Sequence, residues 1–485
     1  MYLLNLVLYL QPLPQLLQQP LLNIMPGAVF GFLIDNLQHL GKVLEEAGLI
    51  AMMILALGIL GAGYGYSRTK KVFSGQALLF GGVAWVVTTM VLLPLSGDGF
   101  GGLAEGLVAP VAWATLYCEY AIIMEAAFLK WLVIPVASRD GGDTDPVDAG
   151  RRRLLRAIPL LVGGGSLIML GVRLMPGWYQ SVYSPPEKAG AGPSPEITPV
   201  EHFYTVSKNF SDPVVAEAGW SLSVKGMVQN PRKYLLADLM ARSTTNQTVT
   251  MECVSNNVGG PLMSTTVFGG IPLRDLLSEA GPEPAATTVV FTARDGYSES
   301  LPLKLVMDAP EVMLVHTMGG APLTDRHGFP ARILTPGHYG VKSTKWVESI
   351  ELIAGERNGY WENQGWDRTE TIRTTSRIDF PRKDAFIRLG TVEIAGIAFA
   401  GNRGISKVEV STDGGKSWNR ARTKPALSNL AWTLWSFEWA PAQEGAYTLQ
   451  VRSTDGSGEM QKAGNAPSFP SGATGYHTVQ VSVTK

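Results

Sequence analysis

The chemistry in the polar part of this chain begins with one cysteine. Cys253 follows the β-like run QTVTMEC and precedes the loop SNNVGG, so its sulfur can project from the end of a strand into a cleft. The other cysteine, Cys118, lies in an apolar run, and no disulfide is expected between the two. Sites that need several thiolates, such as structural zinc and iron–sulfur centres, are therefore excluded. A lone cysteine of this kind is an inert buried residue, a nucleophile, or the ligand of a metal that needs one thiolate.

Three segments of the polar part form a specific pattern by their order and spacing. They are HFYTVSKN from His202, MECVSNNVGG from Met251, and GGAPLTDRHGFPARI from Gly319, the last continued by PGHYGVKSTKW. Together they resemble the oxidoreductase domain of the sulfite oxidase family, which plant nitrate reductase and a periplasmic methionine-sulfoxide reductase share. The terminal region, with its STDGGKSW hairpin, resembles the dimerisation domain of that family. The resemblance covers residues 200–485.

The resemblance implies a molybdenum–molybdopterin cofactor. In this family the metal is held by the two sulfurs of a pyranopterin dithiolene and by one protein thiolate, which here would be Cys253. The phosphate of the pterin needs charge-assisted donors, and the resemblance assigns this role to His327 and Arg332. The loop Lys342-Ser343-Thr344-Lys345 is expected to close around the cofactor, although a solvated basic loop is the alternative for its lysines. The remaining expected contacts are Tyr204, Ser207, Lys208 and Asn209.

The substrate side departs from sulfite oxidases. Those enzymes follow their cysteine with arginines that help to bind the sulfite dianion, whereas this chain has Asn257 and Val258. Their active-site tyrosine falls near Trp366 in the segment GYWENQGWDR, with Tyr360 of the same segment as the alternative. With Trp366 at that position both a positive charge and a phenol are lost, and the electrostatic case for a small dianion weakens. We therefore expect a neutral or larger substrate that enters beside Asn257 and Trp366. Two residues could restore the charge or lie on the surface instead: Arg373 and Arg377.

The predicted activity is two-electron oxygen-atom transfer on a small molecule. A reductase of an oxidised sulfur or nitrogen compound is the alternative, because the same centre runs in both directions. A non-catalytic, membrane-tethered assembly module that kept the fold is a further alternative. The chain has no haem-domain histidine pair and no dinucleotide fingerprint. Electrons are therefore expected to pass to or from a separate carrier, either a cytochrome or a quinone-linked protein.

Two folded domains must position these residues. Residues 200–385 mix β-like runs with short helical ones such as LRDLLSEA, which indicates an α+β domain. Residues 386–485 alternate in period two and contain an Asp-Gly-Gly turn, which indicates an all-β immunoglobulin-like sandwich. A homodimer through this sandwich is one expected assembly. Residues 177–199, rich in Pro, Gly and Ala, are predicted to form a tether.

The first 176 residues are predicted to form an α-helical transmembrane domain in contact with lipid. A hydrocarbon core of ~30 Å needs about 20 apolar residues in a helix. Basic residues at 68–71 and 151–156 should remain in the cytoplasm, which puts the domains after residue 176 at the periplasmic or cell-surface side. The stretch RRRLLR and its apolar continuation resemble a twin-arginine export signal, with a plain anchor as the alternative. The expected spans are roughly 2–24, 45–66, 74–95, 108–136 and 157–175.

Charge and histidine content exclude further functions. The net charge of −1 and the absence of a polybasic tail argue against a nucleic-acid partner. Only His39 precedes residue 202, so a haem with two histidine ligands is excluded from the membrane part. Glu119 and Glu125 lie within the fourth expected span, where carboxylates either serve a function or bond to neighbouring helices.

Overall fold

The computed structural model describes residues 16–17, 48–67, 76–96, 108–127, 192–209 and 212–485. The chain divides into two compact units, one of Met1–Met25 with His39–Val182 and one of Pro26–Gln38 with Tyr183–Lys485. Nearly all of the expected span 2–24, the whole span 157–175 and the basic stretch 151–156 lie outside the described residues.

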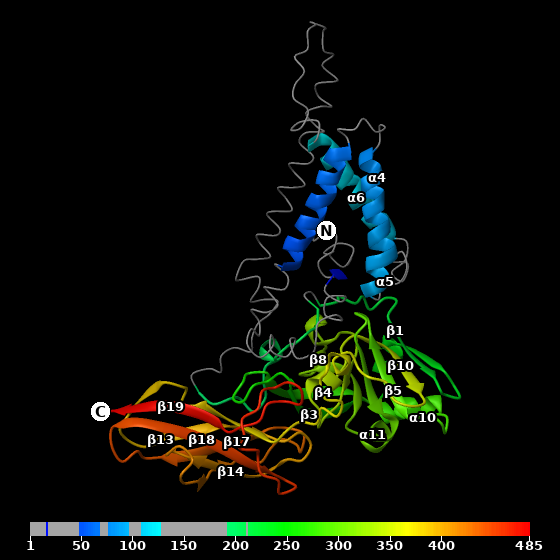
Figure 1. Cartoon of the computed structure of the whole chain (residues 1–485). Helices are drawn as coiled ribbons and strands as arrows, with labels where there is room; N and C mark the ends of the chain where they lie inside the picture. The colour runs from blue at the N-terminus through cyan, green and yellow to red at the C-terminus, as the bar shows by residue number, and fades with distance from the viewer. Residues whose placement is uncertain (1–15, 18–47, 68–75, 97–107, 128–191, 210–211) are drawn as a thin grey trace, which may run out of the picture. The chain divides into compact units, whose positions relative to one another are not determined.

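The described part of the first unit is helical (Figure 1). One described helix, Gly48–Ser67, is long and apolar enough to cross a membrane, which by itself is weak evidence that it does so. The absence of a side chain at Gly81 lets helices α4 and α6 pack closely, since a Cβ there would lie only 2.6 Å from the carbonyl oxygen of Tyr117. Cys118, Glu119 and Glu125 belong to α6. The labelled helices are α4 (Gln76–Val87), the π-helical turn Thr88–Leu92, α5 (Leu93–Ser96) and α6 (Val108–Ala127).

The α+β domain of the second unit contains two separate sheets. The first has the order β2-β1-β10-β5-β6 and is antiparallel except between β1 and β10. Helix α10 (Leu273–Ala280) buries Leu273, Leu276, Leu277 and Ala280, a spacing that forms one apolar face. The helix ends at Gly281, whose φ of 68° suits a left-handed cap. The strands are β1 (Ser221–Gly226), β2 (Arg232–Leu235), β5 (Thr288–Ala293), β6 (Ser298–Pro302) and β10 (Val347–Ile353), and the other helices are α9 (Leu236–Met240) and α11 (Leu303–Asp308).

The second sheet leads directly to the chemically interesting cysteine. Its order is β3-β4-β7-β8, with β9 on β7, and all of these pairs are antiparallel. The β3–β4 ladder ends with Glu252 opposite Met263, so Cys253 is the first residue beyond the sheet. The strands are β3 (Thr245–Glu252), β4 (Met263–Pro272), β7 (Met313–Met318), β8 (Ala321–Pro322) and β9 (Arg332–Leu334); short 3-10 turns cover Val200–His202, Asp325–His327, Gly340–Lys342 and Glu362–Gln364.

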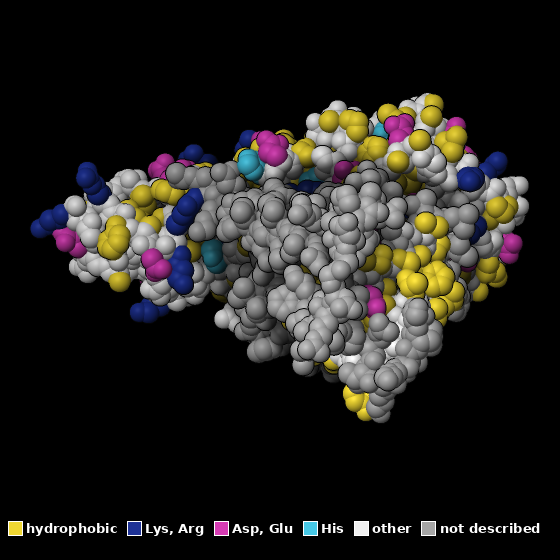
Figure 2. Space-filling view, turned by 90° about the horizontal axis from the view of Figure 1, so that it is seen from above, with side chains coloured by type: hydrophobic (Ala, Val, Ile, Leu, Met, Phe, Trp, Pro, Cys, Tyr) yellow, Lys and Arg dark blue, Asp and Glu magenta, His cyan; other side chains and the backbone are white. Residues whose placement is uncertain are grey.

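The C-terminal region is mostly β, as predicted, and forms two sheets that face a common core (Figure 1). Ile394, Trp435, Val451 and Val481 are buried between them. Strand β11 precedes residue 386, where the sequence analysis begins this domain, yet it pairs with β13 and belongs to the sandwich. At the left-hand end of the view in Figure 2, Lys and Arg side chains lie beside Asp and Glu side chains. The two orders are β11-β13-β17-β16 and β12-β19-β18-β14-β15.

The strands of the sandwich are characterised by alternating buried and more exposed residues, clearest in β18 and β19. They are β11 (Thr375–Phe380), β12 (Ala385–Arg388), β13 (Val392–Phe399), β14 (Ile405–Ser411), β15 (Asn419–Arg420), β16 (Arg422–Thr423), β17 (Thr433–Trp439), β18 (Gly445–Asp455) and β19 (His477–Thr484).

The described end of the predicted tether is fixed to the folded domains. Its Ser194 N–H donates to Asp379 Oδ2 at 3.2 Å. Thr198 exchanges hydrogen bonds with Thr265 of β4, at 2.7 Å through its N–H and 3.2 Å through its hydroxyl. Pro and Gly content predicted a free linker over 177–199, but these backbone groups find partners in the sheets, so residues 192–199 are part of the globular structure.

Candidate active site

A cavity in the second unit collects most of the residues that the sequence singled out. Its lining comes from the chain after the first 3-10 turn, the cysteine loop, the turn between β5 and β6, the segment around β9, and the loops on both sides of β10. Asn209, Asn257 and Lys342 are not among the lining residues. The predicted residues that line the cavity are Tyr204, Ser207, Lys208, Cys253, His327, Arg332, Ser343, Thr344, Lys345 and Trp366.

Cys253 is held at the cavity by the loop that closes the β3–β4 hairpin. Its N–H donates to the carbonyl of Leu262 at 3.0 Å, and its Sγ lies 3.0 Å from Ser255 Oγ. The Asn256 side chain fixes this loop, since it donates to Glu252 at 3.0 Å and accepts from the Leu262 N–H at 3.0 Å. Burial raises the pKa of the Cys253 thiol, and the contact with Ser255 opposes that shift. The site therefore presents one sulfur to the cavity.

Arg332 is the most deeply enclosed cation of the cavity. Its guanidinium donates to the carbonyls of His327 at 3.2 Å and Ser343 at 3.1 Å. Its Nε and the Thr344 hydroxyl are buried without a hydrogen-bond partner among the described residues. Burial lowers the pKa of Arg332 to about 10, so the group stays charged at neutral pH. Since buried donors are rarely left unpaired in native proteins, these two fit an acceptor-rich group in the cavity.

His327 and Lys345 line the cavity together with Arg332. Burial, followed by the charges of Arg332 and Lys345, lowers the pKa of His327 to about 3, so its ring is neutral. The ring packs edge-on against Phe203, with centroids 5.6 Å apart. Lys345 donates to the carbonyl of Arg326 at 3.1 Å and lies 3.9 Å from Asp212 Oδ1. Burial lowers the pKa of Lys345, the direction expected for an ammonium removed from water.

Lys208 is positioned by Asp295, a residue that the sequence did not indicate. Its ammonium donates to the Asp295 carbonyl at 2.9 Å and to Asn209 Oδ1 at 3.0 Å. Asn209 in turn donates to Asp295 Oδ2 at 2.6 Å, so it supports the lysine from behind the cavity wall. Asp295, Tyr297 and Arg326 line the cavity and were missed. Arg326 adjoins His327 in the motif GGAPLTDRHGFPARI, so its place in the site could have been predicted from the sequence. The other two residues are brought to the cavity by tertiary structure alone.

Two tryptophans form an aromatic wall of the cavity. Trp361 and Trp366 both line it. Trp366 packs edge-on against Phe469 at 5.2 Å, and its Nε1 is buried without a hydrogen-bond partner among the described residues. Trp366 thus offers the cavity a large apolar surface and one N–H donor.

Neither candidate replacement arginine lines the cavity. Arg373 donates through Nε to the Ser471 carbonyl at 2.7 Å. Arg377 donates to Asp379, to the Gly260 carbonyl at 2.8 Å and to Ser194 Oγ at 2.9 Å. Both guanidinium groups are thus engaged in joining segments of the fold.

Lys342 was predicted to lie either in a loop that contacts the cofactor or in a solvated basic loop, and its environment differs from both. The residue is 1% exposed, and its ammonium contacts the carboxylates of Glu299 at 2.9 Å and Glu362. It is therefore not part of a solvated basic loop, and its charge is directed at buried carboxylates while its neighbours Val341 and Ser343 line the cavity.

Comparison with known proteins decides the family. Residues 209–361 match the oxidoreductase molybdopterin binding domain, and residues 367–483 match the Mo-co oxidoreductase dimerisation domain. The chain is 30% identical to sulfite oxidase of Arabidopsis thaliana over 273 residues, which is 46% of this chain and 70% of that protein. The chain belongs to the sulfite oxidase family. Its members include enzymes that share the molybdenum cofactor, and the protein is accordingly a molybdopterin-dependent oxidoreductase.

Other similar proteins agree with this family membership. Sulfite oxidase of Gallus gallus is 27% identical over 321 residues, covering 56% of this chain and 69% of that protein. A nitrate reductase of Hordeum vulgare is 26% identical over 321 residues, covering 53% and 36%. The solved sulfane dehydrogenase SoxCD of Paracoccus pantotrophus has the same fold, with a TM-score of 0.51 and 24% identity over 60% of this chain and 82% of that one. The predicted family, cofactor and enzyme class are confirmed, and the non-catalytic alternative is set aside.

Proposed function

We propose that this member of the sulfite oxidase family is a membrane-anchored oxidoreductase that transfers an oxygen atom to or from a small substrate other than sulfite. The observation that supports this proposal is the composition of one cavity, which is lined by a buried thiol, several cations and an aromatic wall. The thiol and the cations suit the cofactor, and the aromatic wall suits a substrate of low charge.

The residues of the cavity fit the molybdenum cofactor. When bound, the cofactor supplies the metal that exchanges one oxygen atom and two electrons with the substrate. Cys253 would provide the protein thiolate, and Arg332, Thr344 and Lys345 would hold the phosphate. Neutral His327 suits the pterin, because it adds hydrogen-bonding capacity without another buried charge. The unpaired donors at Arg332 Nε and Thr344 Oγ1 support this assignment.

The aromatic wall supports a substrate other than sulfite. Arg373 and Arg377 make other contacts, and Asn257 does not line the cavity, so no residue replaces the anion-binding charge at the expected positions. A charge-assisted hydrogen bond contributes about 1.5–3 kcal/mol, or one to two orders of magnitude in affinity. Trp366 offers a single N–H and an apolar face in place of that charge, which favours a neutral or larger molecule.

A reductase is the second candidate. The similarity to the Hordeum vulgare nitrate reductase shows that the fold accompanies reduction in that protein. The cavity itself suits either direction, because its groups bind the cofactor and the substrate without selecting the direction of electron flow.

The test is a substrate screen on the purified full-length protein. Sulfite, organic sulfoxides, N-oxides and nitrate are added one at a time while electron paramagnetic resonance follows the oxidation state of molybdenum. With sulfite and an artificial acceptor we expect kcat/KM below ~10⁴ M⁻¹s⁻¹. A higher value would overturn the substrate assignment. Trp366→Tyr provides a matched variant, since it restores the phenol at the position where sulfite oxidases have one.

Cellular placement and partners form part of the same proposal. The apolar helix Gly48–Ser67 and the basic stretches 68–71 and 151–156 support a multi-pass membrane protein with its catalytic unit outside the cytoplasm. The match to the dimerisation domain over residues 367–483 supports a homodimer. Electrons would pass to a separate carrier, either a cytochrome or a quinone-linked protein.

A further inference from the structure

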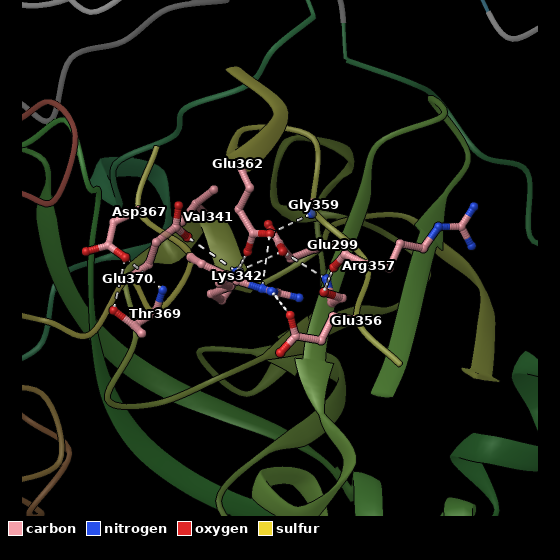
Figure 3. Close-up of polar contacts among 12 residues, drawn as sticks. Glu299, Val341, Lys342, Glu356, Arg357, Gly359, Glu362, Asp367, Thr369 and Glu370 are labelled. Carbon is pink, nitrogen blue, oxygen red and sulfur yellow. Dashed lines mark hydrogen bonds and ion pairs between the residues drawn. The ribbon is translucent and has the colours of Figure 1, made fainter. Parts of the chain in front are cut away.

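Beside the cavity lies a buried group of ionisable side chains that the proposed function does not yet use. We call it the Lys342 cluster, and it consists of Lys342, Glu299, Glu362 and Glu370 (Figure 3). The side chains of Lys342 and the three glutamates are between 0% and 3% exposed. The glutamates come from β6, from a 3-10 turn and from the loop after Trp366, so the fold brings them together from distant parts of the chain.

Two of the carboxylates are well supplied with donors. Glu299 accepts from Lys342 Nζ at 2.9 Å and from the Ser300 N–H at 2.8 Å. Glu362 accepts from Lys342 and from the Gly359 N–H at 3.0 Å. Gly359 permits this packing, because a Cβ there would lie 2.2 Å from Glu299 Oε1. These two groups already neutralise Lys342, with one negative charge in excess.

Glu370 differs from the other two carboxylates. Its Oε2 lies 3.9 Å from Lys342 Nζ, and neither of its oxygens has a hydrogen-bond partner among the described residues. A third ionised carboxylate would leave the cluster with two uncompensated negative charges in a buried site, which is costly. Burial raises the pKa of Glu370 to about 9; Lys342 opposes this shift, and Glu299, Glu362 and Asp367 add to it. At neutral pH Glu370 therefore holds a proton.

The cluster touches the cavity on one side and solvent on the other. The Tyr297 hydroxyl, in the cavity wall, donates to the Val341 carbonyl at 2.8 Å and lies 3.3 Å from Glu299 Oε2. On the far side, Glu362 Oε2 lies 3.9 Å from Nε of Arg368, whose side chain is 42% exposed. A chain of polar contacts thus runs from the cavity through Tyr297, Glu299, Lys342 and Glu362 to the surface.

We propose that the Lys342 cluster takes up and releases the protons that accompany oxygen-atom transfer in the cavity. This inference rests on the proposed function. Oxidation of a substrate X with water gives XO, two protons and two electrons; the electrons leave to the separate carrier, and the protons must leave the cavity. Reduction of XO consumes the same protons and electrons and gives X and water. Tyr297 and Glu299 connect the cavity to the cluster, and Glu370 is the group that stores a proton.

A purely structural role accounts for less of this arrangement. Lys342 needs one carboxylate for charge balance and has hydrogen bonds to two. Glu370 adds no hydrogen bond to the fold through its side chain. Burial by itself lowers the pKa of Lys342, but the carboxylate of Glu299 and the hydrogen bonds to Glu362 and Glu299 oppose it, and the net pKa is raised. The ammonium therefore stays charged, and changes in proton content fall on the carboxylates.

The first experiment locates the stored proton without any turnover. Infrared spectra of the purified full-length protein are recorded as a function of pH for the wild type, Glu370→Gln and Glu348→Gln. The last is a matched control, a partly buried carboxylate of raised pKa paired with Arg294. Burial also raises the pKa of Glu252, to about 8, so this carboxyl contributes a carboxylic-acid C=O signal at pH 7 in all three proteins. We expect a further C=O component that disappears near pH 9, is missing in Glu370→Gln and persists in Glu348→Gln. The same C=O intensity in Glu370→Gln as in the wild type would overturn the proposal.

The second experiment asks whether that proton is coupled to the redox centre. The reduction potential of molybdenum is titrated from pH 6 to 10, with a chemical reductant and no substrate. The wild type and Glu348→Gln should show a change of slope near pH 9, and Glu370→Gln should lack it. Identical pH dependence in all three proteins would refute the coupling. Absence of molybdenum from the wild type would instead refute the proposed function, while the infrared result would still decide where the proton resides.

Discussion

Replacing Arg332 with lysine tests the cofactor cradle at its most enclosed cation. The arginine donates to two carbonyls, of His327 and Ser343, and retains a buried Nε with no described partner. A lysine keeps the charge but has a single nitrogen at its tip, so it cannot serve both carbonyls and a phosphate in the fork geometry of a guanidinium. At least one charge-assisted contact to the cofactor should be lost.

The expected loss is about 1.5–3 kcal/mol in cofactor binding, which corresponds to one to two orders of magnitude in affinity. One buried carbonyl left without a donor should also lower the free energy of unfolding by about 1–3 kcal/mol. Molybdenum and pterin per protein are measured after extended dialysis, and stability is measured by thermal unfolding. Arg332→Lys should lose most of its cofactor under conditions in which the wild type retains it.

Arg403→Lys is the matched control for this experiment. Arg403 likewise joins two segments, since it donates to the Asp455 carboxylate at 2.8 Å and to the Ile372 carbonyl at 3.0 Å, but it does not line the cavity. Its replacement should lower stability and leave the molybdenum content unchanged. If Arg332→Lys retains wild-type molybdenum, or if both variants lose it equally, the assignment of Arg332 to the cofactor is wrong.

Three further predictions concern pH, topology and the second cysteine. The folded pKa of Glu370, about 9, lies above its ordinary value of 4.5; the folded state therefore holds an extra proton between these values, and its stability should fall as pH rises through this window. Urea unfolding from pH 5 to 9 should show this fall, and a Glu370→Gln protein that shows the same fall would contradict the assignment. Protease added to spheroplasts should cut within residues 177–191 and release the catalytic unit, whereas complete protection would reverse the proposed topology. Cys118→Ser should leave molybdenum content and turnover unchanged, because Cys118 belongs to α6 of the first unit; a loss of either would show a role for that thiol.

The sequence predicted the parts of the site that depend on local structure. Cys253 lies at a strand end because β3, which is rich in the β-branched residues Thr and Val, precedes it and a glycine-containing loop follows. His327 and Arg332 are close in the chain and remain close in space, joined by a hydrogen bond of 3.2 Å. Such short-range relations can be inferred from the order of residues alone.

Relations between distant segments could not be predicted in this way. Lys342 resembled its basic neighbours, and only the fold shows that Glu299, Glu362 and Glu370 surround its ammonium. Asn209 was expected to contact the cofactor, but its amide is bound to Asp295.

The described end of the tether was misread for the same reason. Its composition says nothing of the partners that Ser194 and Thr198 find in the sheets.

The central claim is that Cys253 supplies the protein's thiolate to molybdenum in this cavity. X-ray absorption at the molybdenum edge of the purified wild type and of Cys253→Ser tests it most directly, because sulfur neighbours are counted without any need for a substrate. We expect three sulfur ligands in the wild type and two in Cys253→Ser, with the pterin retained and turnover lost. An unchanged sulfur count in Cys253→Ser would contradict the assignment of Cys253 as the ligand.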